Sequence, residues 1–77
     1  MKVRVYSAPW CPICKMTKEW LKSHNIEFDD INVQEDIKAS LYVIEKTGQT
    51  AVPVIEIDGQ LIIGFNEETL KEVLRIE

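Results

Sequence analysis

Residues 10–14, Trp-Cys-Pro-Ile-Cys, lie where a strand-like pattern stops and a helix-like pattern begins, and they contain both cysteines of the chain. Two cysteines separated by two residues can close a small disulfide ring, and the first can become a reactive thiolate. In a reducing cytosol such closely spaced cysteines are more often catalytic or metal-binding than structural. The segment therefore predicts a redox-active dithiol, Cys11 and Cys14, at a strand-to-helix junction.

The hydrophobic pattern predicts seven elements in the order β-α-β-α-β-β-α. Four segments alternate like strands, at residues 2–7, 26–33, 51–57 and 60–63. Three segments have helical spacing, at residues 12–24, at residues 35–46 and from residue 67 onward. Pro12 suits the first turn of the first helix and Asn25 its end, Gly48 follows the second, and Asn66 is a candidate N-cap of the third.

The same spacing predicts which helix faces are buried. In the second helix Ile37, Leu41 and Ile44 share one side, so we expect them to pack on the sheet. In the first helix Met16 and Trp20 are expected in the core. The only histidine, at position 24, is expected to contact the last carbonyl groups of that helix rather than to act in catalysis.

The order of the elements predicts the topology. Two β-α-β crossovers favour right-handed connections between parallel strands, and Asp58-Gly59 favours an antiparallel hairpin. The fold class is therefore α/β, with a four-stranded mixed sheet and three helices that cover both its faces. The 77 residues suffice for one domain, residues 1–77, and for no second core. Functional groups of such sheets gather beyond the carboxyl ends of strands, and Cys11 lies just after the first strand.

Composition narrows the function classes. The formal net charge of −4 argues against nucleic-acid binding, which needs clustered lysines and arginines. The chain has no long apolar run, so the sequence predicts neither a membrane span nor a secretory signal. We therefore expect a soluble, cytoplasmic protein. No long exposed apolar stripe is apparent in the pattern, which favours a monomer.

The place of Cys11 at the start of a helix predicts that unpaired backbone N–H groups, including that of Cys14, and the helix dipole stabilise its thiolate. Lys15 and Lys18 add positive potential there. Cys14, inside the first turn, should be more buried and less acidic. Cys11 would then attack a substrate disulfide and Cys14 would resolve the mixed disulfide, while Pro12 stiffens the turn and removes one amide donor.

Several motifs occur together, namely Val5-Tyr6-Ser7, Cys11-Pro12-x-Cys14, Lys18, Ala51-Val52-Pro53, Asp58-Gly59 and Ile63-Gly64-Phe65-Asn66-Glu67. In this combination the chain resembles the glutaredoxins of the thioredoxin superfamily over essentially its whole length. The resemblance implies a thioredoxin fold and thiol-disulfide oxidoreductase activity. It also implies a cis bond between Val52 and Pro53 beside the cysteines, with the Val52 backbone pairing to a substrate. From the residues alone, a trans proline starting an edge strand is the ordinary alternative.

Two departures from the glutaredoxin pattern concern the reductant. Many glutaredoxins have a glutathione-binding lysine at the position of Ala8, and a glycine at the position of Ile63. Gly64, Asn66 and Glu67 still offer backbone or polar contacts to a glutathione-like group. The resemblance thus implies a weakened glutathione site.

Aromatic residues near the motif point towards protein partners. Trp10 stands directly before the first cysteine, a feature that resembles thioredoxin, and it is a candidate docking residue. A hybrid of this kind resembles the NrdH-type redoxins, which implies reduction by a thioredoxin-reductase-type flavoprotein.

Val5 occupies the position where thioredoxins have a buried aspartate. Phe65 is either a surface contact beside the motif or an anchor of the last helix, and Tyr6 either borders the site or packs in the sheet.

The leading function is a thiol-disulfide oxidoreductase without a bound cofactor, whose redox group is the Cys11-Cys14 disulfide. The resemblance implies disulfide-containing protein substrates such as ribonucleotide reductase or a peroxidase. A glutathione-dependent glutaredoxin is the alternative within the same class. A zinc site needs four ligands, of which one Cys-x-x-Cys supplies two, and an iron-sulfur carrier would need glutathione. An interaction domain with inert cysteines is the remaining alternative.

Overall fold

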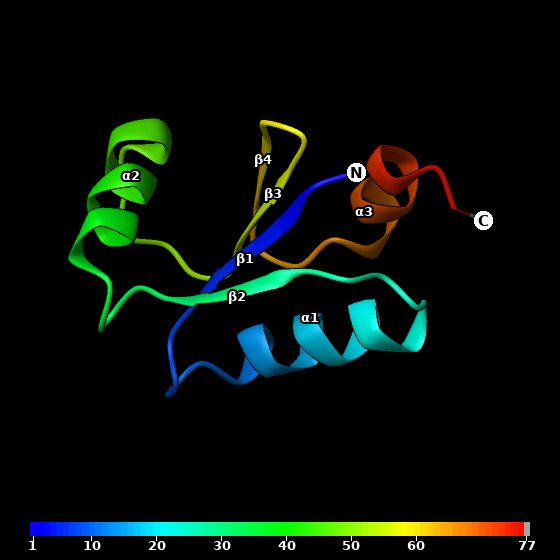
Figure 1. Cartoon of the computed structure of the whole chain (residues 1–77), viewed down its shortest axis with the longest axis horizontal. Coiled ribbons are helices and arrows are strands. Elements are labelled where there is room, and N and C mark those ends of the chain that lie inside the picture. Colours follow the sequence, from blue (N-terminus) through cyan, green and yellow to red (C-terminus); the bar gives the residue numbers. More distant parts are fainter. Residues whose placement is uncertain (77) are drawn as a thin grey trace.

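The computed structural model describes residues 1–76, and within them the elements follow the predicted order (Figure 1). The strands are β1 (Val3–Ser7), β2 (Asp29–Asn32), β3 (Val54–Ile57) and β4 (Gln60–Ile63). The helices are α1 (Pro12–Ser23), α2 (Ile37–Thr47) and α3 (Glu67–Leu74). Three strands are shorter than predicted: β1 begins one residue and β2 three residues after the expected start. β3 begins only after Pro53, which has no N–H for a ladder.

The sheet has the strand order β2-β1-β3-β4. β1 and β2 are parallel, as the first crossover predicts. The second predicted parallel crossover is wrong, because β3 runs antiparallel to β1, with Val54 opposite Tyr6. After α2 the chain enters the sheet beside the end of β1, so β3 starts there and runs back along β1. In the β3–β4 hairpin Asp58 (φ 49°) and Gly59 (φ 90°) adopt the left-handed conformation that such turns require.

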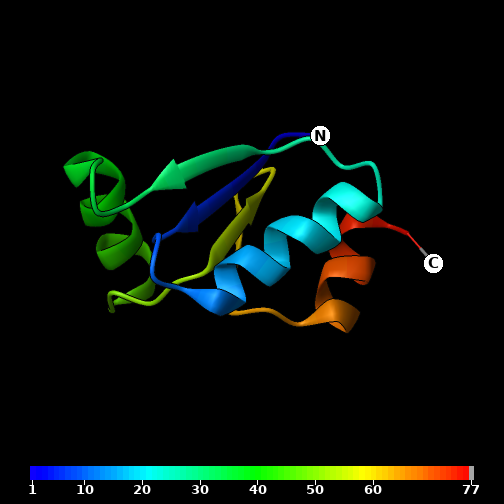
Figure 2. The same cartoon turned by 90° about the horizontal axis from the view of Figure 1, so that it is seen from below.

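The helices cover both faces of the sheet, as predicted. α1 and α3 lie side by side on one face (Figure 2). The main hydrophobic cluster joins them to the sheet and consists of Val3, Val5, Leu21, Ile55, Ile57, Ile62, Leu70 and Leu74. A second cluster joins α2 to the other face and consists of Tyr6, Ala39, Val43 and Val54.

The predicted core face of α2 is wrong. Ile37, Leu41 and Ile44 are exposed, the first two to 72% and 60%. The helix instead packs on the sheet through Ala39 and Val43. Both sides of α2 carry apolar residues, so the spacing did not decide which side meets the sheet. The small side chain of Ala39 permits the closer approach.

The prediction that Met16 of α1 is a core residue is also wrong. Met16 is 43% exposed and Ile13 is 46% exposed, whereas the inner side of α1 is formed by Cys14, Thr17 and Leu21. Thr17 can be buried because its hydroxyl donates a hydrogen bond to the Ile13 carbonyl oxygen at 2.8 Å. Thr17, a polar residue whose hydroxyl is hydrogen-bonded, is therefore buried on the side of α1 where an apolar residue was expected.

The ends of the helices match the local signals of the sequence. Asn66 caps α3 and Asp36 caps α2, each through a side-chain oxygen that accepts a backbone N–H. Gly48 (φ 77°) ends α2 in the left-handed conformation. His24 is at the C-cap of α1, with Nδ1 2.9 Å from the Trp20 carbonyl oxygen, which confirms its predicted structural role.

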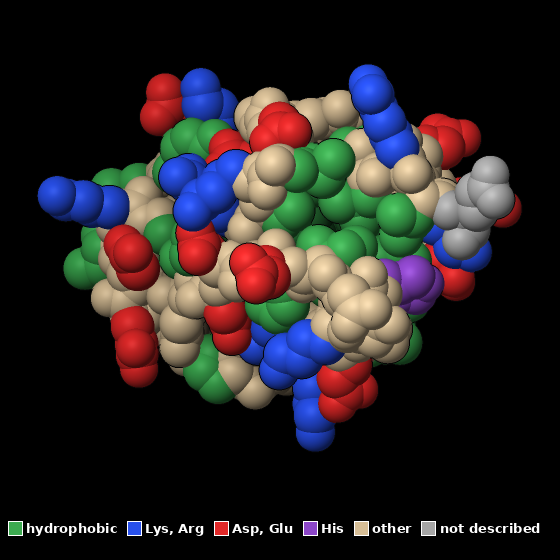
Figure 3. Space-filling model, turned by 45° about the vertical axis from the view of Figure 1, so that its right-hand side comes forward, with side chains coloured by type: hydrophobic (Ala, Val, Ile, Leu, Met, Phe, Trp, Pro, Cys, Tyr) green, Lys and Arg blue, Asp and Glu red, His purple; other side chains and the backbone are tan. Residues whose placement is uncertain are grey.

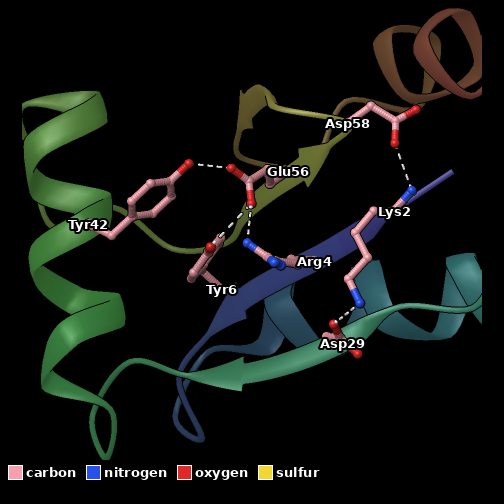
Figure 4. Close-up of polar contacts among 7 residues, drawn as sticks. All are labelled: Lys2, Arg4, Tyr6, Asp29, Tyr42, Glu56 and Asp58. Carbon is pink, nitrogen blue, oxygen red and sulfur yellow. Dashed lines mark hydrogen bonds and ion pairs between the residues drawn. The ribbon is translucent and has the colours of Figure 1, made fainter.

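A buried carboxylate ties α2 to the sheet (Figure 4). Glu56 of β3 is 7% exposed and accepts hydrogen bonds from Arg4 (3.2 Å), from Tyr6 (3.3 Å) and from Tyr42 of α2. The hydrogen bond to Glu56, together with burial, raises the pKa of Tyr42 to about 12. Burial is also the main cause that raises the pKa of Tyr6. Of the two readings of Tyr6, the structure supports packing in the sheet.

The surface shows how charge and shape are distributed. On the face drawn in Figure 3, acidic and basic side chains are interspersed with apolar surface. One open pocket, of about 940 Å³, is lined by residues that include Lys18 of α1, Asp30 of β2 and Phe28 just before β2, and neither cysteine lines it. Within residues 1–76, no helix is long and apolar enough to cross a membrane.

Candidate active site

Cys11 is the N-cap residue of α1. Its backbone is extended (φ −98°, ψ 105°), and its sulfur accepts a hydrogen bond from the backbone N–H of Cys14 at 3.1 Å. The N–H of Cys11 itself donates to the Ala8 carbonyl oxygen at 3.2 Å, which fixes the loop before the helix. The sulfur therefore lies where free amide donors and the positive end of the helix dipole favour negative charge.

Cys14 lies one turn inside α1 and is 1% exposed. Burial, and then the hydrogen bond with Cys11, raise the pKa of the Cys14 thiol to about 11. A backbone hydrogen bond with Ala8 and the charge of Lys18 act in the opposite direction and lower that pKa. At neutral pH Cys14 is accordingly a thiol, and it is the more buried of the two cysteines, as predicted.

Lys18 belongs to a polar network beside the cysteines. Its Nζ lies 3.0 Å from Oδ2 of Asp30 in β2, and the Ser7 hydroxyl donates to Oδ1 of the same carboxylate at 2.9 Å. The sequence indicates Lys18, but it assigns no role at this site to Ser7, which is part of the Val5-Tyr6-Ser7 motif, or to Asp30. The parallel pairing of β1 with β2 brings Ser7, at the end of β1, close to Asp30 of β2, and a correct prediction of this pairing would have brought the two residues together. Lys15 is exposed, and its predicted influence on Cys11 stays a prediction.

The Val52-Pro53 peptide bond is cis, as the family resemblance implies. Val52 is partly buried against a small cluster formed by Ala8, Cys11 and Cys14. The carbonyl oxygen of Pro53 accepts a hydrogen bond from the backbone N–H of Gly64 at 2.8 Å. The end of β4 therefore holds the proline loop beside the cysteines.

The other residues that were predicted to contact a substrate differ in how far they are exposed. Trp10 is 64% exposed directly before Cys11, and Pro12 is exposed in the first turn of α1. Phe65 packs edge-on against Trp20, with ring centroids 6.1 Å apart, and both are partly buried against the main cluster. Trp20 thus lies at the edge of the core that it was predicted to join, and the packing supports the reading of Phe65 as an anchor of α3.

The predicted glutathione-type contacts are altered by the hydrogen bonds just described. The N–H of Gly64 is occupied by Pro53, and the side-chain oxygen of Asn66 is occupied by the N–H of Thr69 at 3.1 Å. The Gly64 N–H is therefore not a free donor for a bound carboxylate, and the Asn66 oxygen serves as the cap of α3. Ile63, the neighbour of Gly64, presents an apolar side chain that is 49% exposed.

The arrangement suits dithiol chemistry. Both cysteines are unbonded in this structure, and the N–H of one faces the sulfur of the other. Within residues 1–76, no three His, Cys, Asp or Glu side chains are grouped so that they would hold a metal ion. Two sulfurs in one helical turn can instead form a disulfide and release it again.

The mixed four-stranded sheet, the helices on both faces and the Cys-x-x-Cys turn at the start of α1 together define a thioredoxin-fold redox protein. A family model for glutaredoxin matches residues 3–62. The chain therefore belongs to the glutaredoxin family. The activity common to that family is thiol-disulfide oxidoreduction through a cysteine pair.

Individual relatives agree with this assignment. The chain is 46% identical over 72 residues to a glutaredoxin-like 8.6 kDa protein of the rubredoxin operon of Clostridium pasteurianum, which covers 94% of this chain and 96% of that protein. It is 42% identical over 71 residues to the glutaredoxin-like protein NrdH of Lactococcus lactis subsp. lactis, with 92% and 97% covered.

Solved structures give the same fold. The glutaredoxin from Archaeoglobus fulgidus superposes with a TM-score of 0.85 at 34% identity, over 96% of this chain and 86% of that one. The NrdH-redoxin from Escherichia coli, a glutaredoxin-like protein with a thioredoxin-like activity profile, superposes with a TM-score of 0.80 over 100% of this chain and 96% of that one. At 22% identity the latter likeness concerns the fold.

Proposed function

We propose that the protein is a dithiol electron carrier that reduces protein disulfides through Cys11 and Cys14. The Cys11 thiolate attacks one sulfur of a substrate disulfide, so that a Cys11–substrate disulfide forms and one substrate sulfur leaves and takes up a proton. Cys14 then loses its proton and attacks the Cys11 sulfur. The Cys11–Cys14 disulfide forms, the second substrate thiol leaves, and two electrons have passed to the substrate.

The observation that carries this proposal is the contrast between the two sulfurs. Cys11 accepts the N–H of Cys14 at the start of the helix and is 7% exposed, whereas Cys14 is 1% exposed and protonated at neutral pH. The nucleophile and the resolving thiol are thereby separated, and the resolving thiol stays inactive until a mixed disulfide holds a sulfur within its reach.

The surface around Cys11 supports a protein reductant rather than glutathione. Ala8 supplies no cation and Gly64 has its N–H occupied. Trp10 exposes apolar surface directly before Cys11, and Ile63 does so beside the proline loop. A glutathione carboxylate needs charged or free N–H partners, whereas a protein can bury apolar side chains. We therefore assign re-reduction to a thioredoxin-reductase-type flavoprotein, with protein disulfides such as those of ribonucleotide reductase or a peroxidase as substrates.

Two coupled assays test the proposal. NADPH consumption with a model protein disulfide is followed with thioredoxin reductase in one assay and with glutathione plus glutathione reductase in the other. We expect turnover with thioredoxin reductase and little with glutathione. Efficient turnover with glutathione alone would instead make the protein a glutathione-dependent glutaredoxin.

Three variants serve as controls. Cys11→Ser should abolish turnover in both assays, and retained turnover would remove the assigned nucleophile. Cys14→Ser should stop after the first attack and accumulate a mixed disulfide, detectable by mass. Trp10→Ala should raise the KM for the flavoprotein about fivefold or more with little change in kcat, as expected for loss of a docking residue.

A further inference from the structure

α2 carries an apolar stripe on the side that faces away from the sheet. Ile37, Leu41 and Ile44 follow one another at spacings of four and three residues, so they lie in one row along the helix. Figure 4 shows the opposite, inner side, from which Tyr42 points to Glu56. Within residues 1–76, this row packs into neither of the two hydrophobic clusters that flank the sheet.

Two opposite charges border the stripe along one edge. Lys38 and Glu45 are both exposed and are seven residues apart, which places them on the same edge two turns, or ~10 Å, from each other. Among the residues that the structure describes, neither forms an ion pair. The edge on the other side of the stripe carries the uncharged Ser40 and Thr47.

This pattern is complementary to itself when reversed. In an antiparallel pair of α2 helices related by a two-fold axis at Leu41, Ile37 of each copy lies near Ile44 of the other. Like edges face each other in antiparallel helix pairs, so Lys38 of each copy also lies opposite Glu45 of the other. A parallel pair would instead set the charged edge against Ser40 and Thr47, without ion pairs.

We propose that the outer face of α2 binds a second copy of the same chain, as an antiparallel, two-fold symmetric helix pair centred on Leu41. The helix is 11 residues long, about 16 Å, so the face is smaller than the ~1,200 Å² that stable interfaces bury. The dimer is therefore weak and forms at high protein concentration. This replaces the expectation of a monomer from the sequence, which had assigned the stripe to the core.

The active site remains accessible in this dimer. α1, which begins at Cys11, packs on the opposite face of the sheet from α2. Each copy therefore presents its own thiol, and dimer formation does not depend on the redox state of the cysteines. Disulfide reductase activity per chain should be the same for Leu41→Glu as for the unaltered protein.

Equilibrium sedimentation tests the face. The average mass of the unaltered protein should rise from that of one chain towards that of two between ~10 µM and ~1 mM protein. Leu41→Glu, which sets two carboxylates against each other at the axis, should hold the mass at one chain throughout. Ile13→Glu, a matched change on exposed α1, should dimerise like the unaltered protein. A constant single-chain mass for the unaltered protein, or equal dimerisation of Leu41→Glu, would overturn the proposal.

A charge exchange tests the antiparallel register. Lys38→Glu alone and Glu45→Lys alone should each lose the dimer, because like charges then face each other across the edge. The double variant Lys38→Glu/Glu45→Lys should regain it, and an equimolar mixture of the two single variants should form a mixed dimer. Dimerisation of either single variant as strong as that of the unaltered protein would refute the register. Circular dichroism spectra should show the same helix content for all variants, since both positions are exposed.

Discussion

Two sulfurs in one helical turn have different surroundings in this protein. Cys11 is the cap and its sulfur accepts an N–H, whereas the sulfur of Cys14 is inside the turn, where burial is the main influence on its pKa. This difference of three positions along a helix start is the basis on which we propose Cys11 as the nucleophile and Cys14 as the resolving thiol. This assignment was available from the sequence, because capping and burial at a helix start follow from local position alone.

The raised pKa of Cys14 should be visible in its reaction with an alkylating agent. In Cys11→Ser, burial, the main cause of the shift, remains. The alkylation rate of Cys14 should therefore keep rising with pH well beyond the point where that of free cysteine levels off, near ~8.5. The position of the plateau is the quantity compared, since burial also slows access. A plateau near that of free cysteine would contradict the assignment.

Ser7 and Asp30 show where residue-level prediction stopped. Each is unremarkable in the sequence, and only the register of β1 against β2 brings them together with Lys18. Val5 lacks the carboxylate that thioredoxins place there, and the nearest carboxylate of this network is on the neighbouring strand instead. Long-range pairing of this kind has no local signature.

At the scale of elements, order and ends were predictable and orientation was not. Gly48 ends α2 through its left-handed backbone and Asn66 caps α3 through its side chain, both at the predicted positions, whereas the cap at Asp36 lies one residue after the expected start of α2. The direction of β3 and the inner side of α2 depend on contacts with the rest of the fold. The buried Glu56 is the clearest example, because it joins β1, β3 and α2 through hydrogen bonds that no periodicity indicates.

A matched pair of substitutions tests the orientation of the helices. Leu21 is fully buried and Leu41 is 60% exposed, and both are helical leucines. Leu21→Ala should lower the free energy of unfolding by ~2–5 kcal/mol, since it opens a cavity in the core. Leu41→Ala should change it by no more than ~0.5 kcal/mol, measured by urea denaturation at low protein concentration. Equal losses in the free energy of unfolding would mean that Leu41 is a core residue, contrary to the structure.

The Glu56 cluster can be tested by titrating Tyr42. The chain has two tyrosines, so Tyr6→Phe leaves Tyr42 as the only one. Its tyrosinate absorbance should appear with a pKa of about 12. Adding Glu56→Gln removes the carboxylate that favours the neutral phenol, and the pKa should fall towards the ordinary value of 10.0. An unchanged pKa in the Glu56→Gln variant would show that the hydrogen bond with Glu56 does not raise the pKa of Tyr42.

For the whole molecule, these shifts add up to a dependence of stability on pH. Cys14 and Tyr42 have raised pKa values in the folded state, so folded chains hold protons that unfolded chains release. Their contribution is fully present below about pH 9 and is lost as the pH rises through about 11 and 12. The urea midpoint of the reduced protein should fall over this range.

The oxidised protein provides the control for that measurement. Once Cys14 is joined to Cys11 it has no proton to lose, so the part of the decline that begins near pH 9 should be absent. The part due to Tyr42 should remain. Identical curves for the reduced and oxidised proteins would mean that Cys14 does not contribute to the alkaline loss of stability.

The two ends of β1 have different neighbours. At its start the backbone N–H of Lys2 donates to Asp58 at 2.7 Å, which ties the first residues to the β3–β4 hairpin, and at its far end the chain enters the loop to Cys11. In Figure 1 the N-terminus and that loop lie at opposite ends of the strand. An affinity tag placed before Met1 would leave the reactive sulfur pointing away from a solid support. Immobilised Cys14→Ser protein would then serve as bait that captures its disulfide partners covalently and releases them to a reducing agent.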